Sequence, residues 1–92
     1  MKGRTLAEIY NEQMRDPEFR AAYEAEERKE RLQALLAEWR DNAGLTSSQV
    51  AERMGIKPPT ISRMEKNITS ASFETLARYA KACGVTSATL FF

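Results

Sequence analysis

The N-terminal part of the chain places apolar and polar residues with the period of amphipathic helices. From Thr5 to Met14 the apolar side chains recur every three or four residues, and Thr5 with Glu8 forms the pattern of a capping box. Asp16 and Pro17 then supply a cap residue and a proline suited to the first helical position. The pattern therefore predicts a short helix that ends near Met14 and a second helix that begins at Pro17.

The second helix continues without glycine or proline to Asn42, either as one long helix or as two abutting ones. The charges between Glu24 and Arg31 have both signs, which suits a solvated face with pairing between residues four positions apart. Beyond them, apolar side chains recur on one side of the helix and are expected in the core. These core residues are Leu32, Leu35, Leu36 and Trp39.

Glycines and capping residues divide the rest of the chain into shorter helices. Gly44 ends the long helix, and Thr46 or Ser47 caps a helix that runs to Met54. Gly55 then suits a turn that needs a positive φ angle. A further helix follows at once, so the pattern predicts two short helices joined by a tight glycine turn.

The helix after this turn opens on two consecutive prolines and runs to about Asn67. Because the residue before a proline avoids the α region, we expect Pro58 to lie outside the helix and Pro59 to be its first residue. Ser72 caps the next helix, which ends at Gly84.

A last helical turn over residues 88–91, capped by Thr86 or Ser87, is expected to carry the apolar C-terminal segment. No stretch alternates with a period of two for long enough to indicate a strand. The predicted fold class is therefore all-α.

Composition narrows the class of protein. The chain has 92 residues, of which 42% are hydrophobic and 29% charged, as in a soluble globular domain with one modest core. No apolar run is long enough to span a bilayer and no secretory pattern opens the chain, so we expect a cytoplasmic protein without a membrane partner. Histidine is absent, and the single cysteine, Cys83, is expected in the core. We therefore expect no metal, cofactor, small-molecule substrate or enzymatic activity.

The charge is distributed unevenly along the chain. Residues 1–43 contain eight Lys and Arg against ten Asp and Glu, whereas residues 44–92 contain six against three. The net charge of +1 is therefore the sum of −2 over residues 1–43 and +3 over residues 44–92. We expect the two halves to meet different partners.

The two short helices around Gly55 have the spacing of a helix-turn-helix, with the small Ala51 where the helices approach each other. The segment GLTSSQVAERMGIKPPTISRME resembles the helix-turn-helix of the Xre/Cro family of repressors, and SASFETLARYAKACGVTSATLF resembles the segment that follows it in that family. The resemblance covers residues 32–92. It implies a five-helix lambda-repressor-like domain, assigned here to residues 31–92, that binds double-stranded operator DNA.

Two departures from the family bear on how DNA is recognised. Ser47 stands where the family usually has glutamine, and prolines occupy the first positions of the recognition helix, where polar side chains that read bases are common. The remaining candidates for base reading are Pro59, Thr60 and Arg63. Arg63 can bind guanine O6 and N7 with two hydrogen bonds, while Thr60 or the Pro59 ring can contact a thymine methyl. A phosphate contact is the alternative role for Arg63.

Other polar residues are expected to position the domain on the DNA backbone without reading sequence. These phosphate-binding candidates are Ser47, Ser48, Lys57, Lys66 and Asn67. Glu65 stands near them, and phosphates repel a carboxylate unless a cation neutralises it. The family resemblance implies that Arg40 and Glu65 form an internal salt bridge between the first domain helix and the recognition helix.

Residues 1–30 form a helical extension ahead of this domain. The segment DPEFRAAYEAEERKERLQALLAEWR resembles the one that precedes the domain in HigA-type antitoxins, whose partners are small basic RelE/HigB-like ribonuclease toxins. The resemblance implies an antitoxin that neutralises such a toxin and represses its own operon. The candidate toxin-binding residues are Leu6, Ile9, Tyr10, Met14, Phe19 and Tyr23.

Two alternatives stay open for this extension. Its aromatic residues can instead cover the core of the domain itself. The protein can also be a stand-alone or phage-type repressor whose extension is a dimerisation arm.

We expect a homodimer, because one recognition helix with few base-reading side chains discriminates poorly and paired half-sites multiply its selectivity. The candidate seam is the apolar end formed by Leu90, Phe91 and Phe92.

Overall fold

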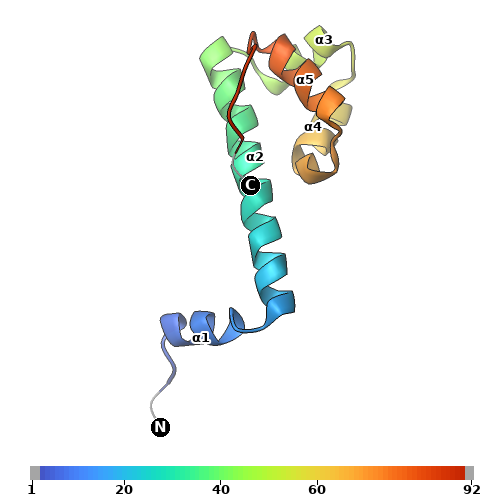
Figure 1. The fold of residues 1–92 in the computed structure, drawn as a ribbon. Coiled ribbons are helices and arrows are strands. Elements are labelled where there is room, and N and C mark those ends of the chain that lie inside the picture. Colours follow the sequence, from blue (N-terminus) through green and yellow to red (C-terminus); the bar gives the residue numbers. More distant parts are fainter. Residues whose placement is uncertain (1–2, 91–92) are drawn as a thin grey trace.

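The computed structural model describes residues 3–90, and its regular elements in that range are all helical, which confirms the all-α class. The elements are α1 (Leu6–Gln13), α2 (Pro17–Ala43), α3 (Ser47–Met54), α4 (Pro58–Lys66), the 3-10 turn η1 (Ile68–Ser70) and α5 (Phe73–Ala82). The molecule is elongated, measuring 58 × 23 × 22 Å. Helix α2 is a long rod with α1 at its start and α3, α4 and α5 gathered beside its other end (Figure 1).

The first two helices begin where the capping residues predict. Thr5 Oγ1 accepts a hydrogen bond from the backbone N–H of Glu8 at 3.1 Å, and the Glu8 carboxylate accepts one from the Thr5 N–H at 3.4 Å. Asp16 Oδ1 accepts from the Glu18 N–H at 3.0 Å, and Pro17 is the first residue of α2. Both starts are therefore determined by residues within one turn of the helix.

Helix α2 is one uninterrupted helix of 27 residues, which decides between the two expected arrangements. In its charged part, Arg31 and Glu27 form an ion pair at 3.4 Å, with both side chains about half exposed. Its C-terminal part supplies Leu32, Leu36 and Trp39 to the core, as predicted. Within residues 3–90, no helix is both long enough and apolar enough to cross a membrane.

The core lies between the C-terminal half of α2 and the elements α3, α4, η1 and α5. Its buried side chains are Leu32, Leu36, Trp39, Val50, Ala51, Met54, Ile61, Ile68, Tyr79 and Cys83. Cys83 is 8% exposed and takes the core position expected of it. The turn η1 was not predicted, because three residues are too few for a periodic pattern, yet its Ile68 is 1% exposed and packs beside α2.

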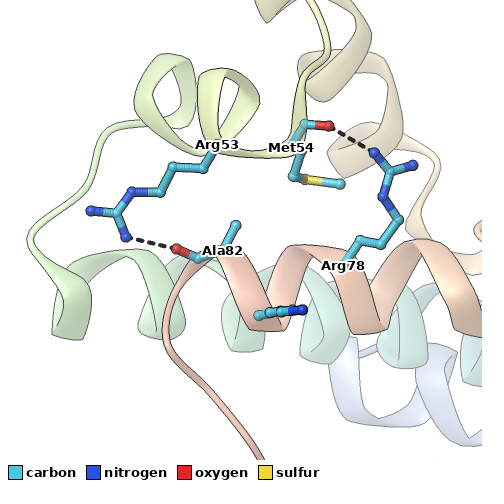
Figure 2. Close-up of a pocket in the computed structure, with 5 residues that line it drawn as sticks. Arg53, Met54, Arg78 and Ala82 are labelled. Carbon is cyan, nitrogen blue, oxygen red and sulfur yellow. Dashed lines mark hydrogen bonds between the residues drawn. The ribbon is translucent and has the colours of Figure 1, made fainter.

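Two arginines join the ends of α3 and α5 (Figure 2). Arg78 on α5 donates a hydrogen bond to the carbonyl oxygen of Met54 at 2.7 Å, and Arg53 on α3 donates to that of Ala82 at 2.9 Å. Met54 and Ala82 are the last residues of their helices, where carbonyl groups lack an intrahelical donor. Each arginine thus caps the partner helix and places a positive charge at its negative end.

The start of α4 differs from the prediction. Lys57 is the N-cap, with φ −79° and ψ 147°, and its carbonyl oxygen accepts from the Ile61 N–H at 3.3 Å. Pro58 is therefore the first helical residue and not a residue outside the helix. The first N–H groups of a helix have no intrahelical acceptor, so two prolines in succession remove only donors that the helix does not use.

The prediction of a last helical turn over residues 88–91 is also wrong for the residues of it that the structure describes. After Gly84 the chain is non-helical to Leu90 and runs back along α2 (Figure 1). An extended residue advances the chain by more than twice the rise of a helical one, so this segment brings Leu90 to a hollow that Leu32 and Leu35 also line. Phe91 and Phe92, the rest of the expected dimer seam, lie outside the described residues.

Candidate DNA-binding surface

Helices α3 and α4 form a helix-turn-helix whose turn is determined locally. Thr46, and not Ser47, caps α3: its hydroxyl accepts from the Gln49 N–H at 3.2 Å, and the Gln49 side chain accepts from the Thr46 N–H at 2.8 Å. Gly55 has φ +73°, a conformation that strains other residues, and it ends α3. Helix α3 packs against α4, and Ala51 on α3 is fully buried, as expected of a small side chain that lets helices approach each other.

The candidate base-reading residues lie on the exposed side of α4. Ile61 is fully buried and so defines the inward side of the helix. Pro59 and Arg63, four residues apart, lie on the opposite side and are exposed, and Thr60 is exposed on the flank. The structure therefore brings Pro59, Thr60 and Arg63 together on one accessible surface.

The candidate phosphate-binding residues surround this surface. Ser47 and Ser48 form the first turn of α3 and are half-buried and exposed, respectively, while Lys57 is exposed just before α4. Lys66 and Asn67 are exposed at the far end of α4. The Asn67 side chain donates to the Arg63 carbonyl oxygen at 3.1 Å and so caps α4, which engages one of its two amide hydrogens.

Glu65, the carboxylate of α4, is turned away from the exposed surface. Arg40 Nη2 lies 3.7 Å from Glu65 Oε2, and both side chains are 21% exposed. The buried Tyr79 hydroxyl donates to the other Glu65 oxygen at 3.5 Å. Burial, with the nearby Glu65 charge, raises the pKa of Tyr79 well above its usual range and keeps the phenol protonated as a donor. The pair implied by the family resemblance is thus present, and the charged groups on the outward side of α4 are cations.

Ser62 is a further exposed residue of α4 that the sequence reasoning missed. It lies three residues after Pro59 and four before Lys66, so the helical period alone places it beside the base-reading candidates. That spacing was the available signal.

A second surface is formed by the N-terminal arm, the described residues 3–30 of the extension. Leu6 is 86% exposed on α1, and Ile9 and Tyr10 are partly exposed. Tyr10 packs edge-on against Tyr23 with ring centroids 5.6 Å apart, and Phe19 stacks on the same ring at 6.5 Å.

Helix α1 and the start of α2 carry this aromatic cluster and lie at the opposite end of α2 from α3, α4 and α5 (Figure 1). Met14, after α1, is half-buried, and none of the six residues belongs to the core. The alternative in which these residues cover the core of the domain is therefore wrong. The structure instead leaves the six candidate toxin-binding residues on the arm, apart from the DNA-binding candidates.

Comparisons with known proteins agree with this geometry. A family model described as helix-turn-helix matches residues 36–90, which is more than half of the chain. Two relatives, both named Antitoxin HigA1 and found in two strains of Mycobacterium tuberculosis, are 39% identical over 67 residues. The alignment covers 73% of this chain and 45% of the relatives, so the chain spans less than half of their length. No solved structure matches the chain significantly. From its helix-turn-helix match and the geometry of α3 and α4, the chain belongs to the Xre-type helix-turn-helix family.

Proposed function

We propose that the chain is an antitoxin that neutralises a RelE/HigB-like ribonuclease toxin and, as a homodimer, binds operator DNA to repress its own operon. The observation that carries this proposal is the extent of the similarity to Antitoxin HigA1. Residues 36–92 number 57, so at least ten of the 67 aligned residues precede Leu36. The similarity therefore extends beyond the helix-turn-helix match toward the N-terminal arm.

The DNA-binding part of the proposal rests on the exposed side of α4. Its charged groups, Arg63 and Lys66, are cations, while Glu65 is paired inward with Arg40. A cationic helix face of this kind suits the major groove, where arginine binds guanine and lysine contacts phosphate. Two copies would place two such helices on paired half-sites one helical turn apart.

The toxin-binding part rests on the N-terminal arm. Helix α1 has no buried residue among those described, and Leu6 on it is 86% exposed. Residues 1–30 contain six Lys and Arg against eight Asp and Glu. Exposed apolar side chains in a segment with a net negative charge suit a basic partner. The opposite charges speed association, and the apolar groups supply affinity. We assign toxin binding to residues 1–30 and DNA binding to residues 31–92, with α2 running through both.

Two measurements on the full-length chain test the proposal: rescue of growth from the toxin encoded by the neighbouring gene, and affinity for operator DNA. Leu6→Lys introduces a positive charge on the arm and should abolish rescue while leaving operator binding intact. Phe73→Lys is the matched control, because Phe73 on α5 is 82% exposed but lies outside the arm. It should preserve rescue, and so should Arg63→Ala, which should weaken operator binding.

Two results would contradict the proposal in different ways. A Leu6→Lys chain that rescues growth as well as the unaltered chain would move toxin binding off the outer face of α1. An unaltered chain that binds its operator but never counteracts the toxin would favour a stand-alone repressor whose arm serves dimerisation.

A further inference from the structure

The first turn of α4 has a surface without backbone hydrogen-bond donors. Pro58 and Pro59 are its first two residues, both are exposed, and neither has an N–H group. The next two N–H groups, of Thr60 and Ile61, both point to the Lys57 carbonyl oxygen at 3.0 and 3.3 Å. In residues 58–61, all of which the structure describes, no backbone N–H is left free. This helix start therefore cannot bind phosphate in the usual way, and it presents hydrocarbon instead.

The two proline rings point in different directions. Pro58 shares its side of the helix with Ile61 and Glu65, three and seven residues later, which are the residues turned toward the core. Pro59 instead shares its side with Arg63 and Lys66, four and seven residues later, which are exposed. Pro59 is therefore the ring that faces outward, in line with the candidate guanine-reading arginine.

We infer that Pro59 is a specificity-determining residue that selects a thymine in each operator half-site through the thymine C5-methyl group. The inference rests on the proposed operator binding and specifies the sequence class of DNA that the surface takes. The methyl group is the apolar feature of base edges in the major groove, and the proline ring has only apolar atoms to offer it.

Exclusion of other bases adds to this preference. A purine edge at the same position would bring N7 and O6 or N6 against a ring that has neither donor nor acceptor. Those groups would lose water without gaining a partner, which disfavours purines, and cytosine lacks the methyl group altogether. Arg63 follows Pro59 by about 6 Å along the helix axis. We therefore expect the guanine that it reads within about two base pairs of the selected thymine, at about 3.4 Å per step.

The experiment uses the full-length chain and DNA that differs by single methyl groups. Binding sites are first selected from random double-stranded DNA, and each thymine of the selected site is then replaced by deoxyuridine. Loss of one buried carbon corresponds to about a fourfold weaker affinity for one half-site, and to about fifteenfold when both half-sites are changed. Because the unaltered protein is used, this measurement does not depend on the folding of any variant.

Variants then assign the effect to one ring. In Pro59→Ala the sensitivity to deoxyuridine should fall below about twofold, because the alanine methyl is too short to cover the base methyl. Pro58→Ala removes the same ring one residue earlier and should keep the full sensitivity. Alanine favours helix formation, so both variants should retain α4, which circular dichroism checks.

Equal deoxyuridine sensitivity in Pro59→Ala and the unaltered chain would overturn the inference, as would selected sites without a constant thymine. Sensitivity that persists in Pro59→Ala and disappears in Thr60→Ser would assign the methyl contact to Thr60 and overturn it too. Selection that enriches no sequence at all would refute operator binding itself. If only the inference about Pro59 fails, specific DNA binding remains, and this distinguishes it from a failure of operator binding.

Discussion

The ion pair between Arg40 and Glu65 joins α2 to the recognition helix, and its removal tests how α4 is held. We would replace Arg40 by Met, which keeps much of the side-chain volume and removes the charge. Glu65→Gln removes the opposite charge and keeps an oxygen that can accept from the Tyr79 hydroxyl. The two single variants and the double variant form a complete double-mutant cycle.

The expected magnitude follows from the separation and exposure of the two groups. At 3.7 Å, and with an effective dielectric constant of about 20, two unit charges attract each other by roughly 4 kcal/mol. Most of this attraction is offset by the loss of hydration, since each side chain is 21% exposed. Removal of one partner leaves the other poorly hydrated, so we expect Arg40→Met to lower the free energy of unfolding by about 2 kcal/mol, below the cost for fully buried pairs. The melting temperature should fall by roughly 10 °C.

Urea unfolding followed by circular dichroism measures all the variants under the same conditions. Glu65→Gln should cost about 1 to 2 kcal/mol, because it leaves the mostly buried Arg40 guanidinium without a neutralising carboxylate. The double variant should cost no more than the worse single variant. Arg31→Met, which breaks the exposed pair with Glu27, is the control and should change stability by less than about 0.5 kcal/mol. A double variant that loses the sum of both single effects would refute the coupling.

Further predictions concern DNA, assembly and pH. Arg63→Ala should cost about 1 to 3 kcal/mol per half-site and relax preference at one base pair, whereas Lys57→Ala should weaken all sequences alike and lower the salt slope by about one per contact. Equal losses on specific and random DNA would make Arg63 a phosphate contact. A chain without residues 1–30 should still melt cooperatively and bind operator DNA but fail to counteract the toxin, because the core begins at Leu32. Light scattering should give a dimer, and a monomer both free and on operator DNA would refute this. Since the pKa of Tyr79 is raised on folding, the unfolded phenol ionises first, so stability should fall as pH rises above about 10. Tyr79→Phe should flatten this fall, measured by urea unfolding on both sides of that pH.

The starts of α1, α2 and α5 were determined by the sequence alone, because each depends on residues within one turn. Thr5, Asp16 and Ser72 all cap the helices predicted from them. Gly55 likewise adopts the positive φ angle that the turn requires. The exposed surface of α4 also followed from the sequence, since helical spacing places Pro59 and Arg63 on one side as soon as the helix is known.

Long-range contacts decided several of the features that the sequence left open or predicted wrongly. The Arg53 and Arg78 caps join residues 29 and 24 positions apart, which no local pattern can indicate. Likewise, the C-terminal segment is extended, and its Leu90 packs beside α2. The helical pattern over residues 88–91 covers only one turn, and one turn of helix is too weakly stable to prevail over such a contact.

The N-terminal arm shows the same division most clearly. Its helices, caps and aromatic residues were evident from the sequence, but a row of aromatic side chains has the same pattern whether it covers the domain core or packs on itself. The tertiary structure decided this, because Tyr23 contacts Tyr10 and Phe19 at one end of α2 while the core begins at Leu32 toward the other. The physical reason is the length of α2: one unbroken helix of 27 residues spans roughly 40 Å and holds the two clusters apart.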